Sequence, residues 1–472
     1  MNTNKLFAML SFCLVSNILA SQSYEIKVKI LNYNRDTLLF GYHYGDKQYI
    51  KDTAFRKNNE FVFKKDTVLE PGMYLVVTQP EHDFFQILID KDKQKFSIET
   101  KLENLTNNLK FKGSKLNTDF LDYVSFVSKR RADADSIGVI LKLNKDTLHT
   151  KFLGDELKRL DKEVKAHQDK LIKEQGTSIL GLLIKSTKEV EVPEFKGTEE
   201  EKSESAFKFY KAHYFDYTEF KDDRIIRLPF FHSKVEKYLT NLTSQHPDSI
   251  NVELDYVLGK CDEKKEVYRY LLSTQLSSIA NSKYVGMDGV YVHLVENYYE
   301  KGKAPWIDKE SLAKILRDAH ALKPLLIDKI APDFVVFKKD STPITLHSVQ
   351  ADYTVLLIWA PDCGHCKKSM PGFIDFYNKY KSKGVEIFAV CNKTGVEEGK
   401  CWDDKEIKMG DWINTSDPKG LSSYKYLYDV KSTPQVYILD KNKKILTKKI
   451  SSEQLSEVMD KIIKLTTNEA HK

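Results

Sequence analysis

Two cysteines that lie three residues apart carry the clearest chemistry in this sequence. Residues 359 to 371 read WAPDCGHCKKSMP, so Gly364 and His365 separate Cys363 from Cys366. The residues that follow predict a helix beginning at Cys363. The first turn of a helix offers N–H groups without intrahelical partners and the positive end of the helix dipole. A thiolate is stabilised there, so we expect the pKa of Cys363 to lie below the usual value of about 8.5.

Cys366 is expected one helical turn after Cys363, on the same face of the helix. From there it can attack a mixed disulfide formed at Cys363 and release the partner, so the pair can cycle between dithiol and disulfide. Gly364 is expected to let the backbone start the turn. His365 adds a donor and positive charge, which favours the thiolate and makes the disulfide a better oxidant.

Two structural roles compete with this interpretation. A structural zinc site usually needs two ligand pairs at suitable spacing, and Cys391 and Cys401 are ten residues apart. A purely structural disulfide between Cys363 and Cys366 would close a very short loop and contribute little stability. We therefore predict no metal and no cofactor. Lone Cys261 is interpreted as a small buried hydrophobic residue.

Cys391 and Cys401 flank the segment NKTGVEEGK. They can form a second disulfide or remain two separate thiols, and the sequence does not decide between these states.

The first residues, MNTNKLFAMLSFCLVSNILASQS, place Lys5 before an apolar stretch from Leu6 to about Ala20. This layout predicts a secretory signal peptide over residues 1–21, cleaved near Ala20 or Ser21. The alternatives are a membrane anchor or an ordinary N-terminal helix, but the apolar stretch is short for a span and polar residues interrupt it. We therefore expect the mature chain outside the cytoplasm.

The composition is that of soluble globular domains. Of 472 residues, 41% are hydrophobic and 30% are charged, and this length predicts several domains. The net charge is +6, with basic and acidic residues interspersed along the chain. Because no basic cluster stands out, the sequence does not predict nucleic-acid binding.

Residues 22–115 are predicted to form an antiparallel β domain of sandwich or barrel type. Runs of strand length, rich in Val, Ile, Phe and Tyr, alternate there with turn residues. The runs are YEIKVKIL, TLLFGYHY, EFVFKK, MYLVVTQ, FFQILID and KFSIETK.

Residues 116–329 are predicted to form an all-α domain. Leu153, Leu157, Leu160 and Val164 recur at helical spacing with charged residues between them. Such an apolar stripe is far more often core than cofactor site, so we assign it no catalysis.

Residues 330–472 are predicted to form an α/β domain. VLLIWA and VEIFAV are continuous apolar runs, as expected of strands covered on both faces. The helix from Cys363 to about Lys381 lies between them. After a connecting region, two further strands, VYIL and ILTKKI, precede a last helix from about Glu453. The order is β-α-β followed by β-β-α.

WAPDCGHCKKSMP, between its strand and its helix, resembles the active-site segment of thioredoxin-fold proteins, in which Trp359 opens the motif. Pro371 matches the proline that kinks the active-site helix of that family. Thr433 and Pro434 match the cis-proline loop, which by resemblance faces the disulfide and pairs with the substrate backbone. The domain therefore looks like a C-terminal thioredoxin fold.

The entry segment IAPDFVVFKKDSTPITL and the long connection between VEIFAV and WINTSDP are similar to the exported TlpA-like branch of this family. The whole chain resembles multidomain proteins of Gram-negative bacteria in which uncharacterised β and helical domains precede the thioredoxin module. The resemblance implies the periplasm or the outer face of the cell envelope. It also implies partners that are protein thiols or disulfides, with a membrane or periplasmic redox protein among them.

The sequence departs from the family pattern at proton-acceptor positions. Ser369 stands where the TlpA-like branch often has glutamate, and Leu357 stands where thioredoxin has a buried aspartate. A residue of the helical domain, Glu386 or water are the remaining candidates to accept the Cys366 proton.

The sequence thus predicts an extracytoplasmic thiol-disulfide oxidoreductase that acts through Cys363 and Cys366. The alternative, from another functional class, is a binding or scaffold protein whose N-terminal domains capture a partner while the redox domain is accessory. A peroxiredoxin-like peroxidase is a minor alternative, because Ala360 replaces the peroxide-binding threonine of that family.

Overall fold

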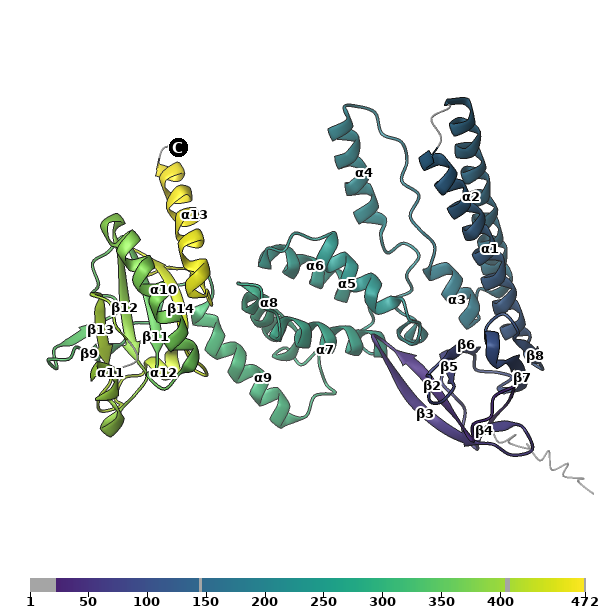
Figure 1. Ribbon diagram of the computed structural model, residues 1–472, viewed down its shortest axis with the longest axis horizontal. Coiled ribbons are helices and arrows are strands. Elements are labelled where there is room, and N and C mark those ends of the chain that lie inside the picture. Colours follow the sequence, from purple (N-terminus) through teal and green to yellow (C-terminus); the bar gives the residue numbers. More distant parts are fainter. Residues whose placement is uncertain (1–22, 144–146, 404–407, 471–472) are drawn as a thin grey trace, which may run out of the picture. The chain divides into compact units, whose positions relative to one another are not determined.

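The computed structural model describes residues 23–143, 147–403 and 408–470. The predicted signal peptide, residues 1–21, lies outside them. The chain divides into two compact units, Met1–Tyr238 and Leu239–Lys472 (Figure 1). The fold class is as predicted, with N-terminal β sheets, a central helical region and a C-terminal α/β sheet. The helices of the predicted all-α domain are distributed over both units, and the exact domain boundaries stay a prediction.

Two four-stranded sheets, ordered β4-β1-β7-β8 and β3-β2-β5-β6, begin the first unit (Figure 1). Burial alternates along β1, where Tyr24, Ile26 and Val28 are inaccessible to solvent, because successive side chains of a strand point to opposite faces. These side chains join those of the second sheet in one hydrophobic core. The strands are β1 (Tyr24–Leu31), β2 (Thr37–Tyr44), β3 (Lys47–Phe55), β4 (Phe61–Lys65), β5 (Gly72–Val77), β6 (Phe84–Ile89), β7 (Lys95–Lys101) and β8 (Lys110–Lys112).

One strand pairing differs from the antiparallel arrangement that the sequence predicts. β1 and β7 run parallel, with Val28 opposite Ile98. Parallel neighbours need a crossover connection, and the strands of the other sheet lie between β1 and β7 in the chain and supply it.

A buried asparagine joins the first long helix to the edge of the second sheet. Asn117 lies in the first turn of α1 (Lys115–Leu143) and is fully buried. Its Oδ1 accepts from the Leu88 N–H at 2.7 Å, and its Nδ2 donates to the Leu88 carbonyl at 2.9 Å. The side chain thus satisfies two backbone groups that edge strand β6 would otherwise bury without partners.

We expect Asn117→Ala to lower the free energy of opening of β6 by about 2–4 kcal/mol, because it leaves two buried backbone groups of Leu88 without partners. Hydrogen exchange of residues 84–89, followed by mass spectrometry, measures this change. The control is Asn108→Ala, which removes an exposed bond to the Asn104 carbonyl and should change the exchange little. Equal exchange in Asn117→Ala and wild type would contradict the assigned role.

The other helices of the first unit are α2 (Thr147–Gln175), α3 (Ile179–Ser186) and α4 (Glu199–His213), and α5 (Phe231–Asn241) spans the division between the units. The predicted stripe is present on α2, where Leu153 and Leu160 are buried.

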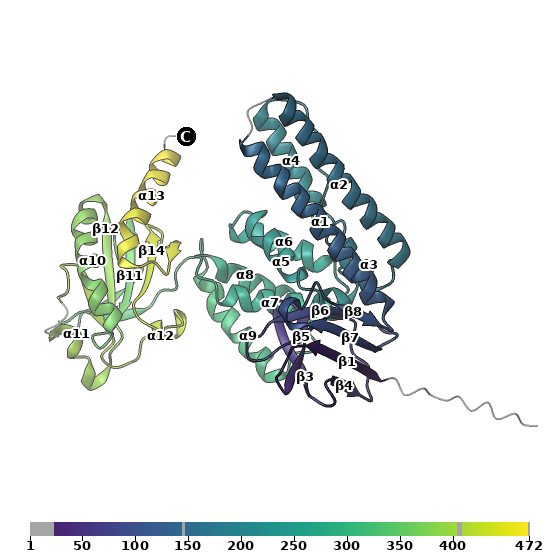
Figure 2. The same cartoon turned by 45° about the vertical axis from the view of Figure 1, so that its right-hand side comes forward.

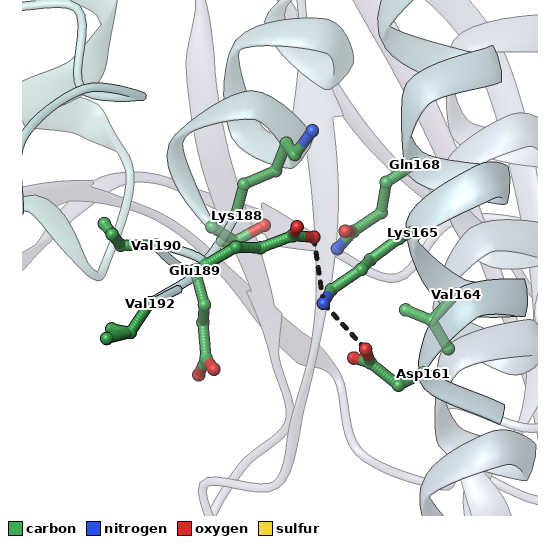
Figure 3. A pocket seen from close by; sticks show the side chains of 10 residues that line it. Asp161, Val164, Lys165, Gln168, Lys188, Glu189, Val190 and Val192 are labelled. Atoms are coloured by element: carbon green, nitrogen blue, oxygen red, sulfur yellow. Dashed lines mark ion pairs between the residues drawn. The ribbon is translucent and has the colours of Figure 1, made fainter. Parts of the chain in front are cut away.

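A cavity of about 620 Å³ lies between α2 and the segment after α3 (Figure 3). Lys165 in its wall pairs with Asp161 at 2.7 Å and with Glu191 at 2.9 Å. Both carboxylates are thus already paired with a lysine, and we assign the cavity no ligand.

The second unit begins with the helices α6 (Pro247–Gly259), α7 (Glu266–Ala280), α8 (Met287–Leu294) and α9 (Lys309–Leu322). Cys261, after α6, is only partly buried, so its predicted place as a buried hydrophobic residue is wrong; its Sγ donates to the Val257 carbonyl at 3.7 Å, at a helix end that remains open to solvent. A buried ion pair between Lys448 and Asp288 joins the C-terminal sheet to α8. Within the described ranges, no helix has the length and apolar character needed to span a bilayer.

The C-terminal domain is built on a seven-stranded sheet ordered β10-β9-β13-β12-β11-β14-β15. β11 lies between parallel β12 and antiparallel β14. The strands are β9 (Val335–Phe337), β10 (Pro343–Thr345), β11 (Tyr353–Trp359), β12 (Val385–Cys391), β13 (Ile413–Ser416), β14 (Gln435–Asp440) and β15 (Ile445–Lys448). The helices are α10 (Gly364–Tyr380), α11 (Lys400–Asp403), α12 (Tyr424–Leu427) and α13 (Ser452–Ala470).

Both faces of this sheet are covered. α10 and α13 pack on one face (Figure 2). Met370, Phe373 and Leu455 share a hydrophobic core there with side chains of β11 and β12. The opposite face packs with α12 and the segment around Leu325. This two-sided burial explains why both central strands read as continuous apolar runs.

Candidate functional site

The end of β11 and the start of α10 position the two cysteines. β11 ends at Trp359, which is 2% exposed and packs in the same core as Cys366. Cys363 is the N-cap of α10, with extended backbone angles of φ −88° and ψ 110°. Because β11 is buried in the middle of the sheet, it fixes the start of α10 at the carboxyl edge of the parallel strands. Sites commonly form at this edge of open α/β sheets.

The Cys363 sulfur is half-buried and surrounded by hydrogen-bonding groups. Its Sγ accepts from the Cys366 N–H at 3.1 Å and donates to the Thr433 carbonyl at 3.2 Å. Burial raises the pKa of Cys363, but hydrogen bonds from the Cys366 and Thr433 side chains and from the N–H groups of Cys366 and His365 lower it by more. The pKa therefore lies below its ordinary value, in the direction that the helix N-terminus predicts.

Cys366 has the opposite character. It is fully buried beneath the first turn of α10. Burial and the hydrogen bond with Cys363 raise the pKa of Cys366 to about 12. The two thiols thus differ in the way that a nucleophile and a resolving thiol require, since one is accessible and acidic and the other is protected and protonated.

We expect iodoacetamide to alkylate Cys363 selectively in the reduced protein. The thiolate is the reacting form, so the rate at Cys363 should reach half its maximum below pH 9.0, whereas Cys366 should stay protonated and unmodified in the same range. Peptide mass spectrometry across a pH series distinguishes the two sites. Equal labelling of both cysteines would contradict the difference in their pKa values.

The Thr433–Pro434 peptide bond is cis, in agreement with the family resemblance. This bond precedes β14, the antiparallel neighbour of β11. The segment therefore reaches the cysteines from the side of the sheet opposite β12, and the Thr433 carbonyl contacts the Cys363 sulfur.

The residues between the cysteines are both exposed. A Cβ built on Gly364 meets nothing within 4 Å, and this glycine has no positive φ. The structure therefore does not require glycine to start the turn, and that part of the sequence interpretation is wrong. The His365 N–H lowers the pKa of Cys363, and the exposed imidazole lies in the first turn of α10.

Glu386 does not lie near enough to accept the Cys366 proton directly. It sits at the beginning of β12, whereas Trp359 pairs with Cys391 at the end of that strand. Five residues of strand separate these ends by roughly 16 Å. Tyr377 donates to both carboxylate oxygens of Glu386 at 3.2 Å. The suggestion from the sequence is therefore wrong for Glu386, because strand direction takes it away from the site.

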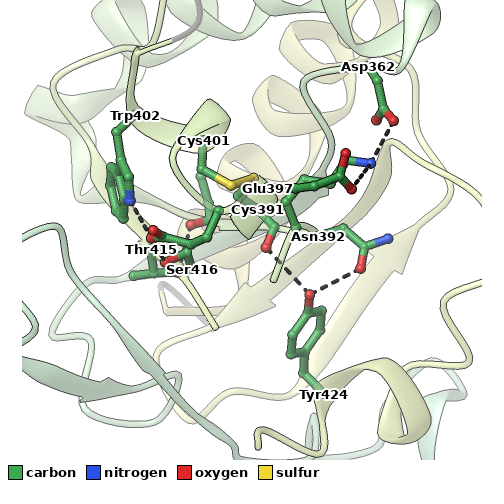
Figure 4. Close-up of a disulfide and its surroundings, with 12 residues drawn as sticks. Asp362, Cys391, Asn392, Glu397, Cys401, Trp402, Thr415, Ser416 and Tyr424 are labelled. Atoms are coloured by element: carbon green, nitrogen blue, oxygen red, sulfur yellow. Dashed lines mark hydrogen bonds and ion pairs between the residues drawn. A yellow bond between two sulfur atoms is a disulfide. The ribbon is translucent and has the colours of Figure 1, made fainter. Parts of the chain in front are cut away.

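Cys391 and Cys401 form a second disulfide, with their α-carbons 5.9 Å apart (Figure 4). Both residues are buried and share a core with Trp359 and Cys366. The disulfide resolves the alternative that the sequence left open.

The sequence interpretation missed a charged pair beside the motif. Asp362 directly precedes Cys363, and the Lys393 ammonium lies 2.6 Å from its Oδ2. Lys393 follows β12, whose carboxyl end lies next to that of β11. The adjacency of two buried parallel strands could have indicated this contact, because their following residues meet at one edge.

Among residues 23–143, 147–403 and 408–470, no group of three or more His, Cys, Asp or Glu side chains could hold a metal ion.

Family models match three parts of the chain. Residues 24–120 match a domain of unknown function, DUF4369, and residues 157–321 match another, DUF5106. Residues 327–448 match the AhpC/TSA family.

Relatives similar to the C-terminal part of this chain include thiol-disulfide oxidoreductases. ResA of Bacillus thuringiensis subsp. konkukian is 31% identical over 142 residues, which cover 30% of this chain and 79% of that protein. ResA of Bacillus anthracis is 29% identical over 147 residues, with coverage of 30% and 79%.

Solved structures with similarity include a domain of a possible thiol-disulfide isomerase from Cytophaga hutchinsonii. It is 34% identical and covers 31% of this chain and 98% of its own, with a TM-score of 0.29. A thioredoxin-like protein from Bacteroides caccae is 20% identical and covers 57% of this chain and 96% of its own, with a TM-score of 0.44.

Proposed function

Because the C-terminal part of this chain belongs to the ResA family of thiol-disulfide oxidoreductases, we propose that Cys363 and Cys366 of its CGHC motif exchange disulfides with protein substrates outside the cytoplasm. The observation that carries the assignment to these cysteines is the contrast between them. Cys363 is half-exposed at a helix N-cap with a lowered pKa, and Cys366 is buried with a raised pKa.

The reaction follows from this contrast. The Cys363 thiolate attacks one sulfur of a substrate disulfide, which forms a mixed disulfide and releases the other substrate sulfur as a thiolate. Cys366 then loses its proton and attacks the Cys363 sulfur, which releases the second substrate thiolate. The substrate gains two electrons and two protons overall, and the chain is left with a Cys363–Cys366 disulfide. The same steps in reverse oxidise a substrate dithiol.

The surrounding residues are proposed to support these steps. The side chain of Cys366, followed by that of Thr433 and by the N–H of Cys366, stabilises the Cys363 thiolate. Pro434 shapes the surface that receives the substrate backbone, and Trp359 packs beneath the motif. His365 tunes the potential from its exposed position, and Gly364 leaves the sulfur open to an approaching protein.

Export is proposed from the N-terminal residues, where a lysine, an apolar stretch and small residues succeed one another. The proposed location is the periplasm or the outer face of the envelope of a Gram-negative bacterium, with a membrane or periplasmic redox protein as partner. N-terminal sequencing of the protein from its host should begin near Ser21 or Gln22. An intact Met1 would contradict export by cleavage.

The test of the function is insulin reduction. The wild-type chain should accelerate the precipitation of insulin by dithiothreitol, because the dithiol reduces interchain disulfides faster than the free reagent does. No acceleration would reject the oxidoreductase proposal and favour a scaffold whose N-terminal domains capture a partner. Faster removal of hydrogen peroxide than of insulin disulfides would favour the peroxidase alternative.

A further inference from the structure

The Cys391–Cys401 disulfide closes a loop that lies next to the CGHC motif. Cys391 ends β12, Cys401 lies in α11, and residues 392–400 connect them. Both sulfurs are in residues that are at most 4% exposed, within the core beneath the motif. The disulfide therefore anchors both ends of the loop at the same place in the buried core (Figure 4).

Backbone and side-chain bonds hold this loop against its neighbours. The Asn392 N–H donates to the Trp359 carbonyl at 2.7 Å, which continues the pairing of β12 with β11 beyond the last strand residue. The Gly395 N–H donates to the Pro418 carbonyl at 2.8 Å. Ser416 donates to Glu398 at 2.6 Å, and the Trp402 indole donates to the same carboxylate oxygen. The loop is thus fixed at several points along its length.

Lys393 is the residue that this loop presents to the motif. Its ammonium lies 2.6 Å from Asp362 and 3.4 Å from Glu397. The Lys393 side chain is 17% exposed, whereas that of Asp362 is 61% exposed, so a largely buried lysine is paired with a carboxylate at the surface. Lys393 and Lys400 lower the pKa of Asp362, with Lys393 the first cause, so this carboxylate is charged at neutral pH.

A charged carboxylate next to a nucleophilic cysteine works against the thiolate, because two negative charges repel each other. Asp362 immediately precedes Cys363 in the sequence. A lysine paired with that carboxylate offsets its field at the sulfur. At separations of roughly 6–10 Å in a water-like dielectric, one unit charge shifts a neighbouring pKa by about 0.3–0.5 unit.

We propose that Lys393 is a positioning residue that offsets the charge of Asp362 and so favours the thiolate form of Cys363, and that the Cys391–Cys401 disulfide holds Lys393 in that place. The proposal rests on the proposed role of Cys363 as the nucleophile. In this proposal the Cys391–Cys401 disulfide affects the reactivity of Cys363 through the position of Lys393.

The other charged residues close to Cys363 in the chain or in the neighbouring segment are left unsubstituted in the test of this proposal. On α10 these are His365, Lys367 and Lys368. From the segment before the cis peptide bond comes Lys431, which pairs with Asp429 at 2.8 Å. None of them is changed in the variants below.

The experiment measures the pKa of Cys363 in the full chain with Cys366→Ala, which needs no reductant and so leaves the second disulfide oxidised. The rate of iodoacetamide labelling at the Cys363 peptide is followed against pH. Lys393→Gln should raise the pKa by about 0.3–0.5 unit, and Asp362→Asn should lower it by a similar amount. The double variant should return to the parent value, and Lys393→Arg should keep it.

Lys400→Gln is the matched control, because Lys400 contacts Glu397 at 2.9 Å and not Asp362 in the same network. It removes the same charge and should move the pKa of Cys363 by less than half as much. A shift of the same sign in Lys393→Gln and Asp362→Asn would overturn the electrostatic role, since structural damage alone gives no reason for opposite signs.

The disulfide is tested by replacing both Cys391 and Cys401 with serine. The pKa of Cys363 should rise, and Lys393→Gln should add less than half of its original shift in this background. An undiminished shift would overturn the anchoring role. The labelling assay needs no disulfide exchange, so its result is separate from the insulin assay, whose failure would reject the proposed function itself.

Discussion

Cys363→Ser is expected to slow insulin reduction by at least about a thousandfold relative to wild type, because a serine hydroxyl forms no nucleophilic anion at neutral pH. The structure leaves no substitute at the same place. Cys366 is fully buried, so a protein disulfide cannot reach it. Its pKa is raised to about 12, so it also forms little thiolate at neutral pH. Turbidity of reduced insulin under dithiothreitol measures the loss.

Cys261→Ser is the control for this variant. Cys261 is also half-exposed, but it lies after α6, in the helical part of the second unit. Its replacement should leave insulin reduction at the wild-type rate. Substantial activity in Cys363→Ser would show that another group is the nucleophile and would contradict the assignment of the site.

Cys366→Ala is expected to stop the reaction halfway. Cys363 still attacks a substrate disulfide, but no thiol one turn away can release the product, so the mixed disulfide accumulates. Turnover should fall by at least about a hundredfold, while up to one substrate chain remains covalently held per enzyme. Non-reducing gels of the variant expressed in its native host, followed by mass spectrometry of the held proteins, measure both.

The control for the trap is the double variant Cys363→Ser, Cys366→Ala, which should hold no substrate. Adducts that persist in the double variant would place the reacting thiol elsewhere. Many unrelated exported proteins on Cys363 would indicate a general oxidoreductase, and one dominant protein would indicate a dedicated pathway. Capture of only cytoplasmic proteins would contradict the proposed export.

Periodicity in the sequence predicted the secondary structure well where one face or both faces of an element are buried. The runs VLLIWA and VEIFAV become β11 and β12, because strands covered on both faces need apolar residues throughout. Edge strand β3 was missed. Its residues KQYIKDTAF are mostly exposed, so burial imposes no alternating pattern on them, and backbone pairing with β2 defines the strand instead.

The local sequence also determined the chemistry of the motif. The spacing of Cys363 and Cys366 sets them one helical turn apart, and the preceding buried strand fixes where the helix begins. These relations involve residues close in the chain, so propensity and spacing suffice to predict them. The Thr433–Pro434 segment required a family resemblance, because about seventy residues separate it from the sulfur that it contacts.

Only the tertiary structure decided which distant groups share the site. Glu386 and Lys393 both flank the core of β12, yet the direction of the strand takes Glu386 away from the cysteines and brings Lys393 to Asp362. The pairing of Cys391 with Cys401 likewise depends on where α11 folds back onto the end of β12. A sequence specifies residue types and local geometry, whereas contacts between separate segments depend on strand order and register, which the packing of the whole sheet determines.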